Sequence, residues 1–138
     1  MDCYSEYLQM TSHHKYLLLT SHSSLICALW GGINNNMLWI VPAGVYINSV
    51  NYWRNPVGGM RRRIDIGWSV LGLMINNVYA IRYSTNAYPY FIMTLIACAM
   101  YPLSYYFYWR KQYIIATFIH SLLHIFANIG NVCLYQSL

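Results

Sequence analysis

Residues 88–135 read YPYFIMTLIACAMYPLSYYFYWRKQYIIATFIHSLLHIFANIGNVCLY, two long apolar runs separated by Arg110, Lys111 and Gln112. Each run has the roughly 17–25 residues that an α-helix needs to cross about 30 Å of hydrocarbon. A polar break of this length suits a short connection between antiparallel helices. This stretch therefore predicts two transmembrane helices that are joined at one membrane surface.

The composition of the whole chain agrees with a membrane location. Hydrophobic residues make up 58% of the 138 residues and charged residues only 8%, against roughly 25% charged residues in soluble domains. Beyond Tyr16 the single acidic residue is Asp65. The net charge of +5 comes from short basic clusters between apolar runs, as in membrane-flanking segments, and this placement argues against nucleic acid as a partner. The partner that we expect is the lipid bilayer.

The same length criterion gives three further apolar runs upstream, and Asn34–Asn36 form a plausible turn between the first two. The sequence thus predicts an all-α, polytopic transmembrane helix bundle of about five helices in a single integral membrane domain, residues 1–138. The expected helices are 16–33, 37–53, 66–83, 88–109 and 113–135.

The positions of the basic residues test the predicted number of membrane crossings independently, because Lys and Arg concentrate in short cytoplasmic loops. Five crossings place seven basic residues on one side and only Arg82 on the other. We therefore expect a cytoplasmic N-terminus. The seven residues are Lys15, Arg54, Arg61, Arg62, Arg63, Arg110 and Lys111.

Histidines provide the candidate metal ligands. His120 and His124 are four residues apart in the last expected helix, so both imidazoles lie on one face and can bind one metal ion, zinc above all. His22, in the polar stretch Ser21–Ser24, is the other histidine expected within the membrane. The alternative is that the histidines form hydrogen bonds to neighbouring helices.

Asp65 and Ser49 are the candidate catalytic residues. Asp65 stands at the expected start of the third helix, where it caps free amides or, alternatively, acts as a general base or a metal ligand. Ser49 lies near the end of the second helix, one loop earlier, so it is expected to face Asp65 at the same membrane depth.

The order Ser49, Asp65, His120 and His124 resembles the CREST superfamily of membrane hydrolases, which includes alkaline ceramidases and adiponectin-type receptors. In that superfamily one helix ends in Ser-x3-His, the next contributes an Asp, and the last contributes an HxxxH pair. The resemblance implies a zinc ion held by the histidines, Asp65 as the acceptor of a proton from the metal-bound water, and Ser49 as the oxyanion donor. The implied reaction is hydrolysis of a lipid amide.

Two features depart from the family pattern. The motif reads SVNYW over residues 49–53, so Trp53 stands where the family has its first His. Family members usually have seven helices, whereas five are expected here. His22 is then the substitute third zinc ligand, and an inactive relative is an alternative to an active hydrolase.

A different class of function is a non-enzymatic subunit of a larger membrane assembly, organellar or virus-associated, with other membrane subunits as partners. The chain is short, has no sizeable soluble loop, and carries amides that suit close helix contacts. We expect Asn76, Asn77, Asn128 and Asn131 to be buried against protein, because unsatisfied amides in hydrocarbon cost several kcal/mol by the general estimate.

Overall fold

The computed structural model describes residues 13–34 and 36–138, and within them it contains five α-helices and one short 3₁₀-helix but no strand. The predicted all-α bundle is confirmed. The elements are α2 (His14–Ile33), η1 (Met37–Trp39), α3 (Ile40–Trp53), α4 (Met60–Tyr83), α5 (Tyr88–Trp109) and α6 (Tyr113–Gln136).

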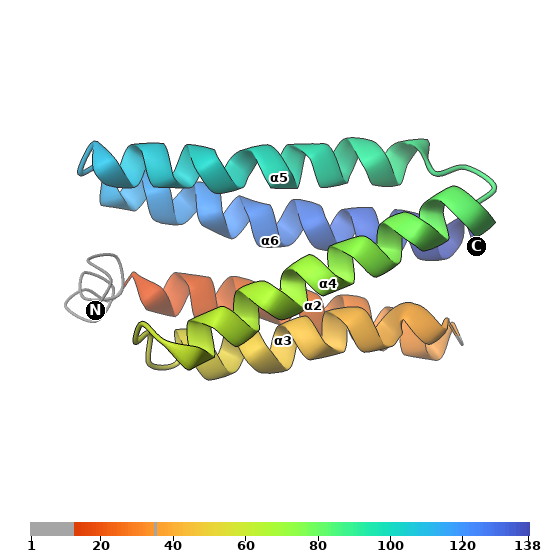
Figure 1. Ribbon diagram of the computed structural model, residues 1–138, viewed down its shortest axis with the longest axis horizontal. Helices are drawn as coiled ribbons and strands as arrows, with labels where there is room; N and C mark the ends of the chain where they lie inside the picture. Colours follow the sequence, from red (N-terminus) through yellow and green to blue (C-terminus); the bar gives the residue numbers. More distant parts are fainter. Residues whose placement is uncertain (1–12, 35) are drawn as a thin grey trace.

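The helices form two antiparallel pairs and one oblique helix (Figure 1). α5 lies along α6, α2 lies along α3, and α2 also packs on α6, which joins the pairs. α4 crosses this assembly obliquely, packed mainly on α3 with a small contact to α6. Because α4 starts beside α3 and ends near the start of α5, the α4 and α5 axes diverge toward the end that carries the α3–α4 loop (Figure 1).

Four of these helices, α2, α4, α5 and α6, are long and apolar enough to cross a membrane. α3 is shorter, with 14 residues, but η1 precedes it directly, so 37–53 together extend about 27 Å. Large apolar side chains such as Ile26, Leu95 and Phe118 point outward. In water they would form an unfavourable surface, and in a bilayer they contact lipid.

α4, which corresponds to the third helix predicted from the sequence, begins earlier than predicted. It starts at Met60 rather than Ile66, so Asp65 is its sixth residue and does not cap it. The N-cap is Gly59, which has a φ of +118°, a backbone conformation that favours glycine. The capping interpretation of Asp65 is therefore wrong, and its side chain is available for tertiary contacts.

The second predicted helix is also divided. Asn36 begins it, because its side-chain oxygen accepts a hydrogen bond from the Leu38 amide at 3.0 Å, and the chain then forms η1 before α3. Pro42 lies in the first turn of α3, where its missing N–H breaks no helical hydrogen bond.

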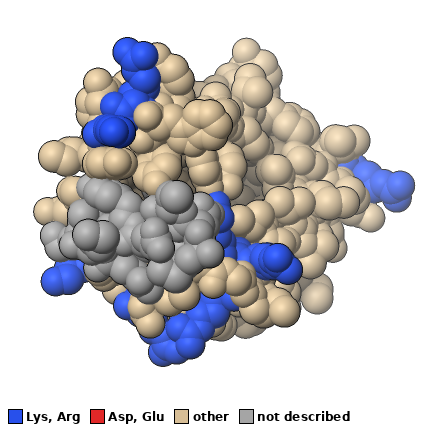
Figure 2. Space-filling model, turned by 60° about the vertical axis from the view of Figure 1, so that its left-hand side comes forward, with Lys and Arg blue, Asp and Glu red and all other residues tan. Residues whose placement is uncertain are grey.

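Seven of the eight basic residues lie at one end of the bundle. They flank the start of α2, the α3–α4 loop, the start of α4 and the α5–α6 loop, whereas Arg82 lies in the last turn of α4 at the other end. Figure 2 shows blue side chains around the end that is turned forward. We refer to it as the basic end.

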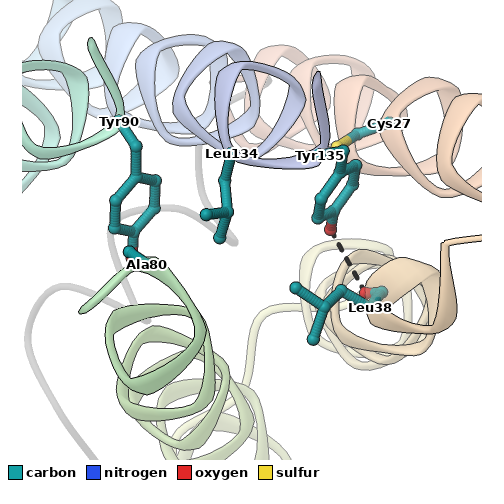
Figure 3. Close-up of a cluster of buried hydrophobic side chains, with 6 residues drawn as sticks. All are labelled: Cys27, Leu38, Ala80, Tyr90, Leu134 and Tyr135. Carbon is teal, nitrogen blue, oxygen red and sulfur yellow. Dashed lines mark hydrogen bonds between the residues drawn. The ribbon is translucent and has the colours of Figure 1, made fainter. Parts of the chain in front are cut away.

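Two apolar clusters close the ends of the bundle. Leu17, Tyr52 and Trp53 form the one at the basic end. At the opposite end, a second cluster brings together side chains from α2, η1, α4, α5 and α6 (Figure 3). In this cluster the Tyr135 hydroxyl donates a hydrogen bond to the Leu38 carbonyl at 3.2 Å. The interior between these clusters is more polar. The second cluster consists of Cys27, Leu38, Ala80, Tyr90, Leu134 and Tyr135.

The four asparagines have protein partners in this interior, as expected. Asn76 donates to Asn131 at 2.8 Å, and Asn77 accepts from the Tyr90 hydroxyl at 3.1 Å. Asn128 donates across to two serines of α2. These bonds connect α4 with α5 and α6, and α6 with α2, inside the bundle.

Candidate functional site

Ser49 and Asp65 form a buried pair between α3 and α4. The Ser49 hydroxyl donates to Asp65 Oδ1 at 2.6 Å, and the two residues are only 1% and 8% exposed. The antiparallel packing of α3 on α4 brings them together across the intervening loop. The predicted proximity of these two side chains is confirmed.

His120 and His124 lie one turn apart on the inward face of α6. Their ring centres are 5.4 Å apart, and both residues are less than a tenth exposed. Within the described part of the chain, His120 Nδ1 and His124 Nε2 have no hydrogen-bond partner. A buried polar atom in that state destabilises a fold by about 1–3 kcal/mol, so these atoms are suited to a bound molecule.

Trp53 completes this cluster from α3. Its indole lies edge-on to the His120 imidazole, with ring centres 5.5 Å apart, and it is 3% exposed. Its Nε1 and the Tyr52 hydroxyl are again buried without a partner among the described residues. In the sequence Trp53 is only a departure from the family motif, whereas in the structure it forms a wall of the site.

A cavity of about 340 Å³ connects these residues. Ser49, Asp65, His120 and His124 all line it, as do the five side chains whose buried polar atoms have no partner within residues 13–34 and 36–138. That volume is at the lower end of the range for small-molecule sites. The remaining wall is largely apolar and includes Val41, Val45, Ile66, Val70, Leu73, Ala97, Leu123 and Ala127.

The cavity opens sideways between α4 and α5. Val70 on α4 and Tyr101 on α5 both line it and are 51% and 40% exposed, and the two helices have little direct contact. Two hydrogen bonds cross this opening. Arg62 donates to the Tyr105 hydroxyl at the basic end, and Tyr90 donates to Asn77 at the other. Because exposed side chains such as Val70 and Leu95 make the outer faces of α4 and α5 apolar, the opening would face acyl chains in a bilayer.

His22 lies apart from this group. Its ring is exposed, its Nδ1 pairs with the Leu18 carbonyl at 2.9 Å, and its ring packs edge-on against Tyr46. Ser21 and Ser24, its neighbours in the same polar stretch, are the residues that point inward. The structure therefore does not bring the expected third ligand to His120 and His124.

The side chains present do not fit the zinc site that the resemblance implies. A catalytic zinc ion is usually held by three protein ligands and a water molecule. His120 and His124 offer two nitrogens, Trp53 occupies the place beside His120, and Asp65 is paired with Ser49. Among residues 13–34 and 36–138, no three His, Cys, Asp or Glu side chains are grouped to hold a metal ion.

Comparison of the chain with protein-family models, with curated proteins and with solved structures finds no match in any of the three.

Proposed function

We propose that this chain is a small multi-pass membrane protein that binds a lipid molecule inside its helix bundle and does not hydrolyse it. The observation that carries the proposal is the cavity itself. It is apolar over most of its wall, opens between α4 and α5 toward the region of acyl chains, and contains the buried polar cluster around His120. An amphipathic molecule matches this combination, because its polar part and its chain each meet a complementary surface.

The topology that accompanies this proposal has the basic end at the cytoplasmic face. Its support is the distribution of seven basic residues against one. Asp65 and His120 are five and seven residues from the starts of their helices, or about 8 and 10 Å along them. The polar cluster then lies just below the cytoplasmic headgroups.

The test is lipid analysis of the purified full-length chain. We expect a defined lipid to copurify at least fivefold enriched over its fraction in the host membrane. Ala127→Phe, which places a ring in the cavity, should abolish the enrichment. Ile129→Phe, two residues further on the same helix and pointing outward, is the matched control and should retain it. Lipid content equal to the bulk membrane in all three proteins would contradict the proposal.

An active zinc hydrolase is the second candidate, favoured by the Ser49–Asp65 pair and by two imidazoles in one cavity that each have a nitrogen without a partner among the described residues. Elemental analysis of the same preparations separates the two. We expect less than about one tenth of a zinc ion per chain. Stoichiometric zinc that disappears in His120→Ala, together with release of fatty acid from a lipid amide, would favour the hydrolase.

A further inference from the structure

We infer that the lipid bound by this cavity has a single acyl chain and an uncharged, hydroxylated headgroup, and that it reaches the cavity from the leaflet at the basic end. This inference rests on the proposed function and specifies its ligand.

The headgroup chemistry follows from the cavity-lining atoms of Tyr52, Trp53, His120 and His124 that have no hydrogen-bond partner among the described residues. Trp53 Nε1 only donates, the Tyr52 hydroxyl both donates and accepts, and the unpartnered nitrogen of each imidazole donates or accepts according to its tautomer. Hydroxyl groups match all four atoms in any tautomer, because each hydroxyl both donates and accepts. A carboxylate or phosphate only accepts, and a quaternary amine does neither.

The charges of the wall favour an uncharged headgroup as well. Asp65 is the single acidic residue beyond Tyr16 and lines the cavity, so an anionic headgroup placed beside it would be repelled. Arg62 also lines the cavity, but it lies nearer the basic end and donates to Tyr105. One acid and one base leave the wall without a net charge to attract an ion.

The number of chains follows from the size of the cavity. A volume of about 340 Å³ holds a small headgroup and the beginning of one chain. The rest of the chain can extend through the opening between Val70 and Tyr101, where it meets bilayer lipid. Two chains would both have to leave through an opening that hydrogen bonds cross at each end.

The leaflet follows from depth and from the angle of α4. The polar cluster lies about 8–10 Å from the helix starts at the basic end, near the depth of headgroups in that leaflet. The α4 and α5 axes also diverge toward this end (Figure 1). A lipid of this leaflet therefore has its headgroup at the right depth and its chain directed to the bilayer centre without inversion.

The experiment is competitive photolabelling of the full chain in phosphatidylcholine nanodiscs. The probe is a monoacylglycerol with a diazirine in its acyl chain, and labelled residues are mapped by mass spectrometry. We expect labels on the facing edges of α4 and α5. Unlabelled 1-oleoylglycerol should compete at a mole fraction at least tenfold lower than oleic acid, oleoyl lysophosphatidic acid, sphingosine or dioleoylglycerol.

Variants test the headgroup contacts. His120→Leu and Trp53→Phe should reduce specific labelling at least threefold, whereas Ile125→Leu, an outward position on the same helix as His120, should leave it unchanged. Melting curves of each variant show whether it is folded. If a charged or two-chain lipid competes best, the inferred headgroup or chain number is wrong while lipid binding stands. If no competitor displaces the probe and labelling is uniform over the lipid-facing surface, the proposed function fails too.

Discussion

The Trp53 indole packs edge-on against the His120 imidazole, at an interplanar angle of 76°. One aromatic ring therefore occupies the space in which a further imidazole would meet His120 and His124. Replacing the Trp53 indole by an imidazole therefore tests whether this ring is what prevents His120 and His124 from binding zinc.

Trp53→His should create a zinc site, because it adds a third imidazole nitrogen beside the two already present. We expect near-stoichiometric zinc in the purified variant and a melting temperature that rises with added zinc, as ligand binding to the folded state requires. Trp53→Phe is the control and should bind none. Equal zinc content in the wild-type chain and in Trp53→His would show that the indole does not decide metal binding.

Ser49→Ala should destabilise the fold, because it removes the hydroxyl that donates to the buried Asp65 carboxyl. Hydrogen bonds to charged groups contribute about 1.5–3 kcal/mol. The measurement is the free energy of unfolding in detergent for Ser49→Ala, Asp65→Asn and the double variant. A coupling energy above about 0.5 kcal/mol is expected for residues in contact, and a purely additive double variant would argue against the pair.

Tyr105→Phe should accelerate lipid exchange, because it removes the hydroxyl that accepts from Arg62 across the opening. The stability change should be small, since hydrogen bonds between membrane helices average about 0.6 kcal/mol. We expect the dissociation rate of the photolabelling probe to increase severalfold. Tyr106→Phe, an exposed neighbour, is the control. Equal dissociation rates in the two variants would show that the Arg62–Tyr105 hydrogen bond does not control access to the cavity.

Cysteines introduced in the two loops that flank α4 should react from opposite membrane sides. Gly58→Cys lies in the α3–α4 loop and Asn86→Cys in the α4–α5 loop. With a membrane-impermeant maleimide on intact cells, Asn86→Cys should be labelled above the native cysteines, whereas Gly58→Cys should require permeabilisation. Labelling of both from one side would be incompatible with α4 as a membrane span.

The helices could be predicted from the sequence because apolar length predicts each helix and the basic clusters predict which helix ends lie together. The start of α4 could not be predicted in this way, since Arg61, Arg62 and Arg63 lie outside the apolar run and such a charged cluster predicts a loop. Long arginine side chains extend from a helix end toward the interface, so a charged run at a membrane surface can be helical.

Only part of the candidate site could be predicted from the sequence. Helical spacing placed His120 and His124 on one face, and the short loop brought Ser49 to Asp65. Spacing within one helix does not fix how that helix is rotated in the bundle. Ser21 and Ser24 point inward, whereas His22, about 100° around the helix from Ser21, points outward. Trp53 was missed because only the packed structure shows its contact with His120.

The oblique course of α4 also links the cavity to the thickness of the surrounding bilayer. With 24 residues, α4 is about 36 Å long, which exceeds a hydrocarbon core of about 30 Å and is accommodated by tilt. A thicker membrane allows α4 to stand more upright, and a thinner one increases its angle to α5. Because these two helices form the edges of the opening, hydrophobic mismatch acts directly on its width. The same chain would thus exchange lipid at different rates in membranes of different thickness.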